Sequence, residues 1–316
     1  MLSNSKRLLI ICQRVDEEDD LLGFFVGWIR EFQKHFAHVE VIALHDKRPR
    51  PKIIRWALLA WRIILLAPRS DAIFCHMSPI FAVIAGLSGK PVYLWYLHRS
   101  VTWKLKLAEK FSRKIFTASA QSLNLKSKKI IAVSHGIDVD RFATKRDWKS
   151  ADRILSVGRI SPIKNFETLL QAGFPITIVG RPIMSGDYAY LEKLKKLGNA
   201  NFVGFVPYTK MPEYYAKADI FVNCSPTGGL DKAVFEAMAS GCIVLVCNEA
   251  FRDDLPSELF FRCDDSQSLA NAIKRLQSKS SHELVALSAK LVQRVGSAHS
   301  LSATIKKIHE NITNRP

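Results

Sequence analysis

The chain has 316 residues, of which 48% are hydrophobic, so it is long enough and apolar enough for two domains with buried cores. Its formal net charge of +17 favours anionic partners such as nucleic acid, anionic lipid or phosphorylated substrates. No run of about 18 apolar residues is present, and the apolar run at 8–12 leads straight into charge, so we expect neither a membrane-spanning helix nor a signal peptide.

The first half of the chain contains short apolar runs without apolar/polar alternation, which is typical of strands covered on both faces. They are residues 8–12, 39–44, 71–75, 91–95, 114–118 and 129–133. After the first run, apolar side chains recur at spacings of three or four, which predicts an amphipathic helix. These side chains are Leu21, Phe25, Trp28, Phe32 and Phe36.

Residues 47–66 combine basic residues and two tryptophans with a strongly apolar stretch. Such a mixture is typical of a helix that lies in a membrane interface. A buried helix of the first domain with a basic entry loop explains the same residues. The sequence leaves both interpretations open.

A polar segment at 143–152 precedes a second series of apolar runs, at 153–158, 176–180, 201–205, 219–223, 242–246 and 258–262. Alternating strands and helices predict parallel sheets. We therefore expect an α/β protein with two doubly wound domains, residues 1–145 and 146–316. The C-terminal helix has no strand after it and either stays with the second domain or packs back on the first.

Ligands of doubly wound sheets bind at the carboxyl ends of strands, so loops after strands are the candidate sites. The first such loop is "SVGRISPIKN" (156–165). Gly158 permits a tight turn, and Arg159 and Lys164 flank it with charges that can grip phosphate oxygens. A solvated surface turn would contain the same residue types.

The second candidate loop is "SPTGGLDKAVFEAMASG" (225–241), between a strand and a helix. Gly228 and Gly229 allow the backbone to approach a ligand closely. Asp231 is a suitable N-cap for a helix that we expect to run to Ser240 and to end at Gly241.

Glu236 is a carboxylate in an otherwise apolar helix and therefore needs a partner. Lys232, four residues earlier, can form an ion pair with it on the same helix face. A pair of ligand hydroxyls is the alternative partner.

The two loops together resemble those of the retaining nucleotide-sugar glycosyltransferases of family 4, also called group 1. In that family a G-R-x-x-x-x-K loop binds the donor diphosphate, and two glutamates separated by seven residues hold the sugar and the ribose. Gly158, Arg159 and Lys164 match the loop, and Glu236 matches the second glutamate. The similarity continues in "YLWYLHR", "SHGIDVDRF" and "YYAKADIFVNCS" and covers most of the chain.

The resemblance implies two Rossmann-like domains that face each other across a cleft, the GT-B fold. It implies that Arg159 and Lys164 bind the donor diphosphate and that Glu236 binds the ribose. The backbone amides of Gly229 and Leu230 would approach the phosphates or the sugar. The first glutamate is missing, because Gly228 occupies its position; Asp231 is the nearest acid and either takes over its role as a catalytic-site residue or only caps its helix.

In the first domain, the resemblance places His98 near the donor sugar and the reaction centre, as a second candidate catalytic residue. A histidine whose nitrogens are satisfied by nearby backbone is the structural alternative. Gly23, at the start of the first helix, is expected on the acceptor side. His76 also follows a strand, but a structural role is favoured there.

These observations predict transfer of a sugar, with retention of configuration, from a nucleotide-sugar donor to an envelope-glycan or lipid-linked acceptor. No Asp-x-Asp-like motif stands at a strand end, so we expect no metal and no other cofactor. Scattered free cysteines fit the cytoplasm, where the protein is either free or bound at the inner, anionic membrane surface. No nucleic-acid motif is present. The missing glutamate keeps two alternatives open, a catalytically silent nucleotide-sugar-binding protein and a membrane-surface protein of the same fold.

Overall fold

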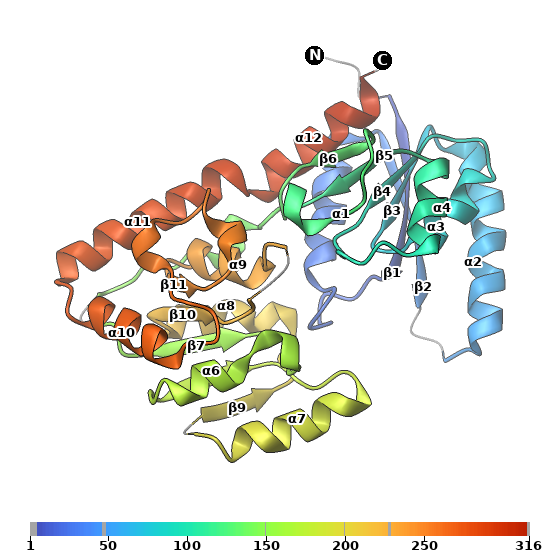
Figure 1. Ribbon diagram of the computed structural model, residues 1–316. Coiled ribbons are helices and arrows are strands. Elements are labelled where there is room, and N and C mark those ends of the chain that lie inside the picture. The colour runs from blue at the N-terminus through green and yellow to red at the C-terminus, as the bar shows by residue number, and fades with distance from the viewer. Residues whose placement is uncertain (1–4, 46–48, 149, 199, 227–228, 315–316) are drawn as a thin grey trace. The chain divides into compact units, whose positions relative to one another are not determined.

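The computed structural model describes residues 5–45, 49–148, 150–198, 200–226 and 229–314. The chain forms two compact units, Met1–Gly136 together with Leu301–Pro316, and Ile137–Ser300 (Figure 1). It passes into the second unit earlier than the boundary expected after residue 145. It returns to the first unit at Leu301, so the last helix belongs with that unit.

The first unit is built on a parallel sheet of six strands in the order β2-β1-β3-β4-β5-β6. The strands are β1 (Arg7–Arg14), β2 (His38–His45), β3 (Ala72–His76), β4 (Val92–Trp95), β5 (Ser112–Thr117) and β6 (Ile130–Ala132). The helices are α1 (Phe24–His35), α2 (Lys52–Leu66), α3 (Pro79–Gly86), α4 (Trp103–Phe111) and α12 (Leu301–Thr313), with short 3-10 turns at Ala67–Arg69 (η1) and Ala120–Ser122 (η2).

Helices cover both faces of the first sheet. Side chains of α1 and α12 form one core with the sheet, and side chains of α2, α3 and α4 form the other. Phe25, Trp28 and Phe32 of α1 are buried as the helical spacing predicted, but Leu21 is not part of this stripe. The helix begins only at Phe24, and Leu21 lies in the preceding turn with half of its surface exposed.

The second unit has a parallel sheet of five strands in the order β11-β10-β7-β8-β9. The strands are β7 (Ile154–Val157), β8 (Ile176–Val179), β9 (Ala200–Gly204), β10 (Ile220–Asn223) and β11 (Ile243–Val246). The α-helices are α5 (Val139–Phe142), α6 (Phe166–Gln171), α7 (Ser185–Lys195), α8 (Met211–Lys217), α9 (Lys232–Ala239), α10 (Ser266–Gln277) and α11 (Ser281–Ala298). Short 3-10 turns lie at Pro162–Lys164 (η3), Tyr208–Lys210 (η4), Glu249–Phe251 (η5) and Ser257–Leu259 (η6).

The prediction of a strand at 258–262 is wrong. Residues Ser257–Leu259 form η6, and only a single bridge joins Phe260 to Val246 at the end of β11. Leu259 and Phe261 are buried, so the apolar run packs against the sheet without extending it. An apolar run of this length has the same composition whether it pairs with a strand or only packs on one.

In the part of the chain that the structure describes, no helix combines the length and the hydropathy needed to cross a bilayer.

Candidate functional site

The two loops singled out in the sequence follow neighbouring strands of the second sheet. β7 pairs with β10, so their carboxyl ends meet at the same edge. The loop after β7 contains Arg159 and ends with η3, and the loop after β10 leads into α9. The topology therefore brings together side chains that lie more than sixty residues apart in the sequence.

The loop after β7 is packed closely against the end of β8. A Cβ atom on Gly180 would lie 1.9 Å from the carbonyl oxygen of Gly158, and Gly180 also has a positive φ of 141°. A Cβ atom on Gly158 would lie 3.3 Å from Cε of Lys164. The lysine side chain therefore passes directly over Gly158, and Gly180 is the position in this loop pair where the backbone requires glycine.

Lys164 donates to a carboxylate from the other loop. Its Nζ lies 2.6 Å from Oδ2 of Asp231. The same oxygen accepts from Nδ2 of Asn223 at 2.8 Å and from Oγ of Ser225 at 3.2 Å. One carboxylate oxygen thus ties together the end of β10, the start of α9 and the loop after β7.

The surroundings of Asp231 keep it ionised. Burial alone would raise the pKa of its carboxyl group, but the charge of Lys164 and the hydrogen bonds from Lys164, Asn223 and Ser225 outweigh burial and lower the pKa below its ordinary value. The interpretation of Asp231 as only a helix cap is wrong. The residue occupies the N-cap position of α9, but its side chain makes no capping hydrogen bond.

Arg159 differs from Lys164 in its surroundings. It is exposed, and within the described residues its guanidinium makes one hydrogen bond, from Nε to Oγ of Ser161 at 3.4 Å. A weak contact with a neutral hydroxyl leaves the positive charge available to an anion. At the carboxyl edge of β7 and β10, Arg159 is therefore a cation available to an anion, whereas Lys164 already has an internal counter-ion.

Glu236 is buried in α9 and accepts hydrogen bonds from three side chains. Lys232 donates to Oε1, as the i,i+4 spacing predicted, and Tyr208 donates to the same oxygen at 3.0 Å. Tyr215 donates to Oε2 at 3.0 Å. A carboxylate has about four acceptor positions, so one position on Oε2 stays open among the described contacts.

The two tyrosines form a buried wall around this carboxylate. Burial raises the pKa of both hydroxyl groups well above the usual value, and the negative charge of Glu236 raises it further. Both therefore stay protonated and act as donors. The guanidinium of Arg141 and the ammonium of Lys232 lie over the ring of Tyr208, at 5.0 and 4.6 Å from its centre.

The glycine pair of the second loop is described only in part. Gly228 lies outside the described residues. The carbonyl oxygen of Gly229 accepts from Nδ2 of Asn248 at 3.3 Å, and the side chain of Leu230 is buried. α9 ends as predicted, with Gly241 in the left-handed region at φ 75° just after Ser240. The contact of the Gly229 and Leu230 amides with a ligand stays a prediction.

The first-unit candidates lie at strand ends or helix starts. His98 is exposed after β4, with its ring 5.3 Å from that of Tyr96. Gly23 is buried directly before α1. His76 ends β3, is stacked on Phe25 at 3.9 Å, and its Nε2 is buried without a partner in the described chain.

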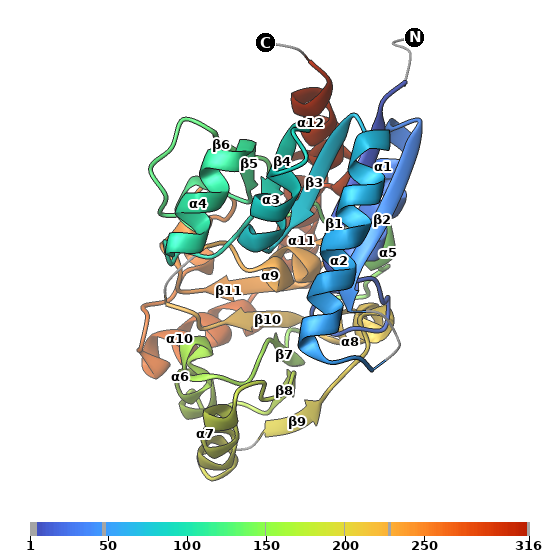
Figure 2. The ribbon, with the colours of Figure 1, turned by 90° about the vertical axis from the view of Figure 1, so that its right-hand side faces the viewer.

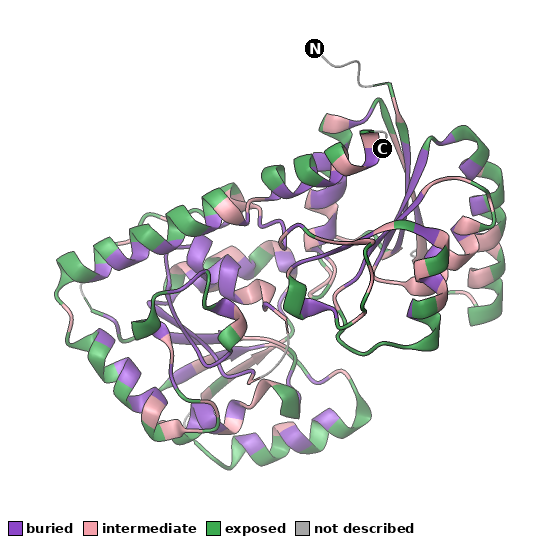
Figure 3. Cartoon of the chain, turned by 45° about the horizontal axis from the view of Figure 1, so that its top comes forward, coloured by how far each residue is buried: buried purple, intermediate pink, exposed green. Residues whose placement is uncertain are grey.

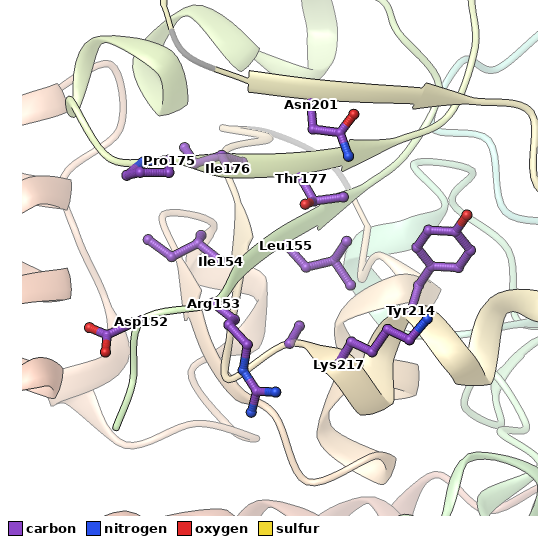
Figure 4. Close-up of a pocket in the computed structure, with 11 residues that line it drawn as sticks. Asp152, Arg153, Ile154, Leu155, Pro175, Ile176, Thr177, Asn201, Tyr214 and Lys217 are labelled. Carbon is purple, nitrogen blue, oxygen red and sulfur yellow. The ribbon is translucent and has the colours of Figure 1, made fainter. Parts of the chain in front are cut away.

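A separate hollow of about 520 Å³ lies at the opposite edge of the second sheet. It is formed by the beginnings of β7 and β8, by Asn201 of β9 and by α8. Figure 4 shows Leu155 and Thr177 on the strands and Tyr214 and Lys217 on α8. Because this hollow adjoins the amino ends of the strands, it is distinct from the candidate site.

The sequence prediction missed four residues of the site: Asn223, Ser225, Tyr208 and Tyr215. Asn223 and Ser225 could have been predicted from the sequence, because they are polar residues at the carboxyl end of an apolar strand, where ligands of such sheets bind. The sequence held no such signal for the two tyrosines, since they lie 21 to 28 residues from Glu236.

Among the described residues, no three His, Cys, Asp or Glu side chains are grouped closely enough to hold a metal ion.

Residues 151–279 match the family model described as glycosyl transferases group 1. No curated protein sequence matches the chain. Among solved structures, Anabaena HepE in complex with UDP and glucose is similar, with 16% identity, a TM-score of 0.74 and coverage of 98% of this chain and 99% of that one.

Sucrose-phosphate synthase from Thermosynechococcus elongatus is 14% identical, with a TM-score of 0.71 and coverage of 97% and 98% of the two chains. A UDP-forming α,α-trehalose-phosphate synthase from Burkholderia xenovorans is 11% identical, with a TM-score of 0.72 and coverage of 98% and 100%. These similarities and the two parallel sheets show that the chain has the two-domain GT-B fold.

Proposed function

We propose that the protein is a glycosyltransferase that moves a sugar from a nucleotide-sugar donor to an acceptor with retention of configuration, like the family 4 enzymes that its loops resemble. The observation that carries the proposal is the meeting of two motif loops at the carboxyl edge of β7 and β10, joined by Lys164 and Asp231. Both loops lie within the segment that matches the glycosyl transferases group 1 model. HepE, a structure with the same fold, is a complex with UDP and glucose.

The donor diphosphate is proposed to bind at the loop after β7. Arg159 supplies an available guanidinium, and Lys164 supplies an ammonium that lies over Gly158. As the bond between sugar and diphosphate breaks, negative charge grows on the leaving phosphate, and these two cations stabilise it electrostatically. No divalent metal is needed for this step in the proposal.

The nucleoside is proposed to bind beside α9. Glu236 accepts one ribose hydroxyl at its open position on Oε2, and a second hydroxyl takes the place of Lys232 on Oε1. The amides of Gly229 and Leu230 contact the phosphates or the sugar. Asp231 is the candidate acid for the missing first glutamate, and the sequence position of that glutamate, Gly228, lies outside the described residues.

The acceptor is proposed to bind to residues of the first unit. His98 is proposed to hydrogen-bond the sugar or the acceptor hydroxyl, since a neutral imidazole can do either. Gly23, at the start of α1, leaves room for the acceptor. An envelope glycan or a lipid-linked intermediate is the proposed acceptor class, and the protein would work in the cytoplasm or at the inner membrane surface.

The proposal is tested by incubating the protein with a panel of nucleotide sugars and measuring release of the nucleoside diphosphate. One donor should be turned over, and H98A and D231N should lower turnover by more than tenfold. An NMR spectrum of the product then gives the anomeric configuration. Inversion would contradict the assignment to the retaining class.

A catalytically silent binding protein is the second candidate function. Two observations favour it: Gly228 stands where the family has a glutamate, and three protein side chains already hold the Glu236 carboxylate. This alternative predicts that a nucleotide sugar raises the melting temperature without being turned over in the presence of any acceptor fraction.

A further inference from the structure

Helix α2 of the first unit is apolar on the side that faces away from the sheet. Only Leu59 and Ile63 of this helix are buried, and both lie on the side that packs on the sheet. The opposite side carries large apolar side chains that are 47–83% exposed: Ile53, Ile54, Trp61, Ile64 and Leu65. We call these five residues the α2 stripe.

The stripe follows the helical period, so it is one continuous surface. Ile53, Trp61 and Leu65 are spaced by eight and four residues, and Ile64 follows Trp61 by three. Residues at these spacings lie on the same face of a helix. A helix on the surface of a globular protein normally shows polar residues on its outer side, whereas a helix that is apolar all round is buried. Apart from Lys52, Arg55 and Arg62, α2 consists of apolar residues, and its outer side is exposed (Figure 3), so this side calls for a partner.

A row of arginines runs along one flank of the stripe. Arg55 and Arg62 of α2 are spaced by seven residues and therefore share that flank, which faces the edge strand β2, and Arg69, the last residue of η1, lines the same groove as Arg62. Arg62 and Arg69 line a groove of about 460 Å³ between α2 and β2, with Leu65 and Leu66 as apolar neighbours. Glu40 is the acidic residue in this groove, and its ion pair is with His38.

The charges of Arg62 and Arg69 have no ion-pair partner among the described residues, whereas Arg55 contacts His45. No acidic residue occurs between positions 49 and 70. The surface therefore combines an apolar stripe with a cationic flank, where Glu40 of the groove is paired with His38. Figure 2 shows α2 in the outer layer of the first unit, beside α3, with α4 on the far side of α3.

We propose that this face of α2 lies in the interface of an anionic lipid bilayer, with the α2 stripe among the acyl chains and Arg62 and Arg69 on lipid phosphates. A helix with one apolar side and a basic flank is the element that binds such an interface in the plane of the membrane. Charge complementarity selects a lipid surface over a second copy of the chain, because two copies would bring the same unpaired arginines together. The inference uses only the first unit and does not depend on the donor site.

The test is co-sedimentation of the full chain with vesicles of phosphatidylcholine alone or with about one third phosphatidylglycerol. The protein should bind only the anionic vesicles and should dissociate as salt rises. R62Q/R69Q should weaken binding about 30-fold, at about 1 kcal/mol for each basic residue near the surface. W61S/I64S should abolish it with the net charge unchanged.

Two control variants separate this surface from general effects. K193Q/K195Q removes two positive charges from α7 of the second unit, and V285S/V292S removes two exposed apolar side chains from α11. Both should bind vesicles like the unchanged protein. Equal losses for K193Q/K195Q and R62Q/R69Q would overturn the proposal in favour of net charge alone.

Two further results would also overturn it. One is binding of R62Q/R69Q to the anionic vesicles that equals binding of the unchanged protein, since the arginines would then contribute nothing. The other is a dimer in sedimentation that W61S/I64S dissociates, without vesicle binding, since a second copy would then cover the stripe. The rise in melting temperature with nucleoside diphosphates, measured on the same variants, reports the donor site separately and should be unaffected.

Discussion

The ammonium of Lys164 lies 2.6 Å from the carboxylate of Asp231, so a cation of the proposed phosphate site has a counter-ion within the protein. Both side chains are partly exposed, and Asp231 is held by two further donors. A diphosphate that approaches this site competes with Asp231 for the lysine. The carboxylate therefore limits how tightly the site can hold an anionic leaving group.

This competition predicts that D231N binds nucleoside diphosphate more tightly than the unchanged protein. The gain should be about fivefold, which corresponds to about 1 kcal/mol for a partly exposed ion pair. Binding of the uncharged nucleoside should not change. Calorimetric titration measures both affinities, and E213Q, which removes an exposed carboxylate paired with Lys210, is the matched control. Weaker diphosphate binding by D231N would show that Asp231 positions Lys164 or contacts the ligand itself.

Glu236 is predicted to stabilise the folded protein and also to bind the nucleoside. E236Q loses the ion pair with Lys232 inside a buried cluster and should destabilise the protein by roughly 1–3 kcal/mol. Y215F removes one hydrogen bond from the same carboxylate, to Oε2, and serves as the matched control. E236Q should weaken nucleoside binding at least tenfold, while Y215F should only lower the melting temperature. If both variants bind the nucleoside equally well, Glu236 is a structural residue.

Protonation of His76 is predicted to destabilise the first unit. Burial lowers the pKa of this histidine to about 3, from about 6.5 in the unfolded chain. The unfolded chain therefore takes up the proton first, and the stability that is fully present above pH 6.5 is lost as the pH falls toward 3. Between pH 7.5 and 5 the loss should be about 2 kcal/mol.

Urea unfolding monitored by tryptophan fluorescence measures this loss, because Trp28 lies beside His76, with ring centres 6.4 Å apart. H76F keeps an aromatic ring against Phe25 and should flatten the pH dependence over this range. An unchanged pH dependence in H76F would assign the effect to other groups.

Sugar transfer is predicted to need no divalent metal, since Arg159 and Lys164 supply the positive charge at the leaving phosphate. Turnover of the donor should be the same with and without EDTA. Loss of turnover in EDTA with recovery on adding magnesium or manganese would contradict the metal-independent mechanism.

The sequence predicted the sheets well and the site only in part. Runs such as 8–12 and 242–246 became buried strands because a sheet covered by helices on both faces buries apolar side chains on each side of the strand. The run at 258–262 also contains three consecutive large apolar residues but packs on the sheet edge, a difference that depends on tertiary contacts. Likewise, the i,i+4 pair of Lys232 and Glu236 follows from helix spacing, whereas the bond from Lys164 to Asp231 exists only because β7 and β10 are neighbours.

The central claim is that the loop after β7 binds the donor diphosphate, and titration of R159A and K164A with nucleoside diphosphate and with free nucleoside tests it most directly. Loss of a charge-assisted contact costs roughly 1.5–3 kcal/mol, so each variant should bind the diphosphate at least tenfold more weakly. Binding of the nucleoside should stay the same. Equal weakening of both ligands, or no diphosphate binding by the unchanged protein, would contradict the account.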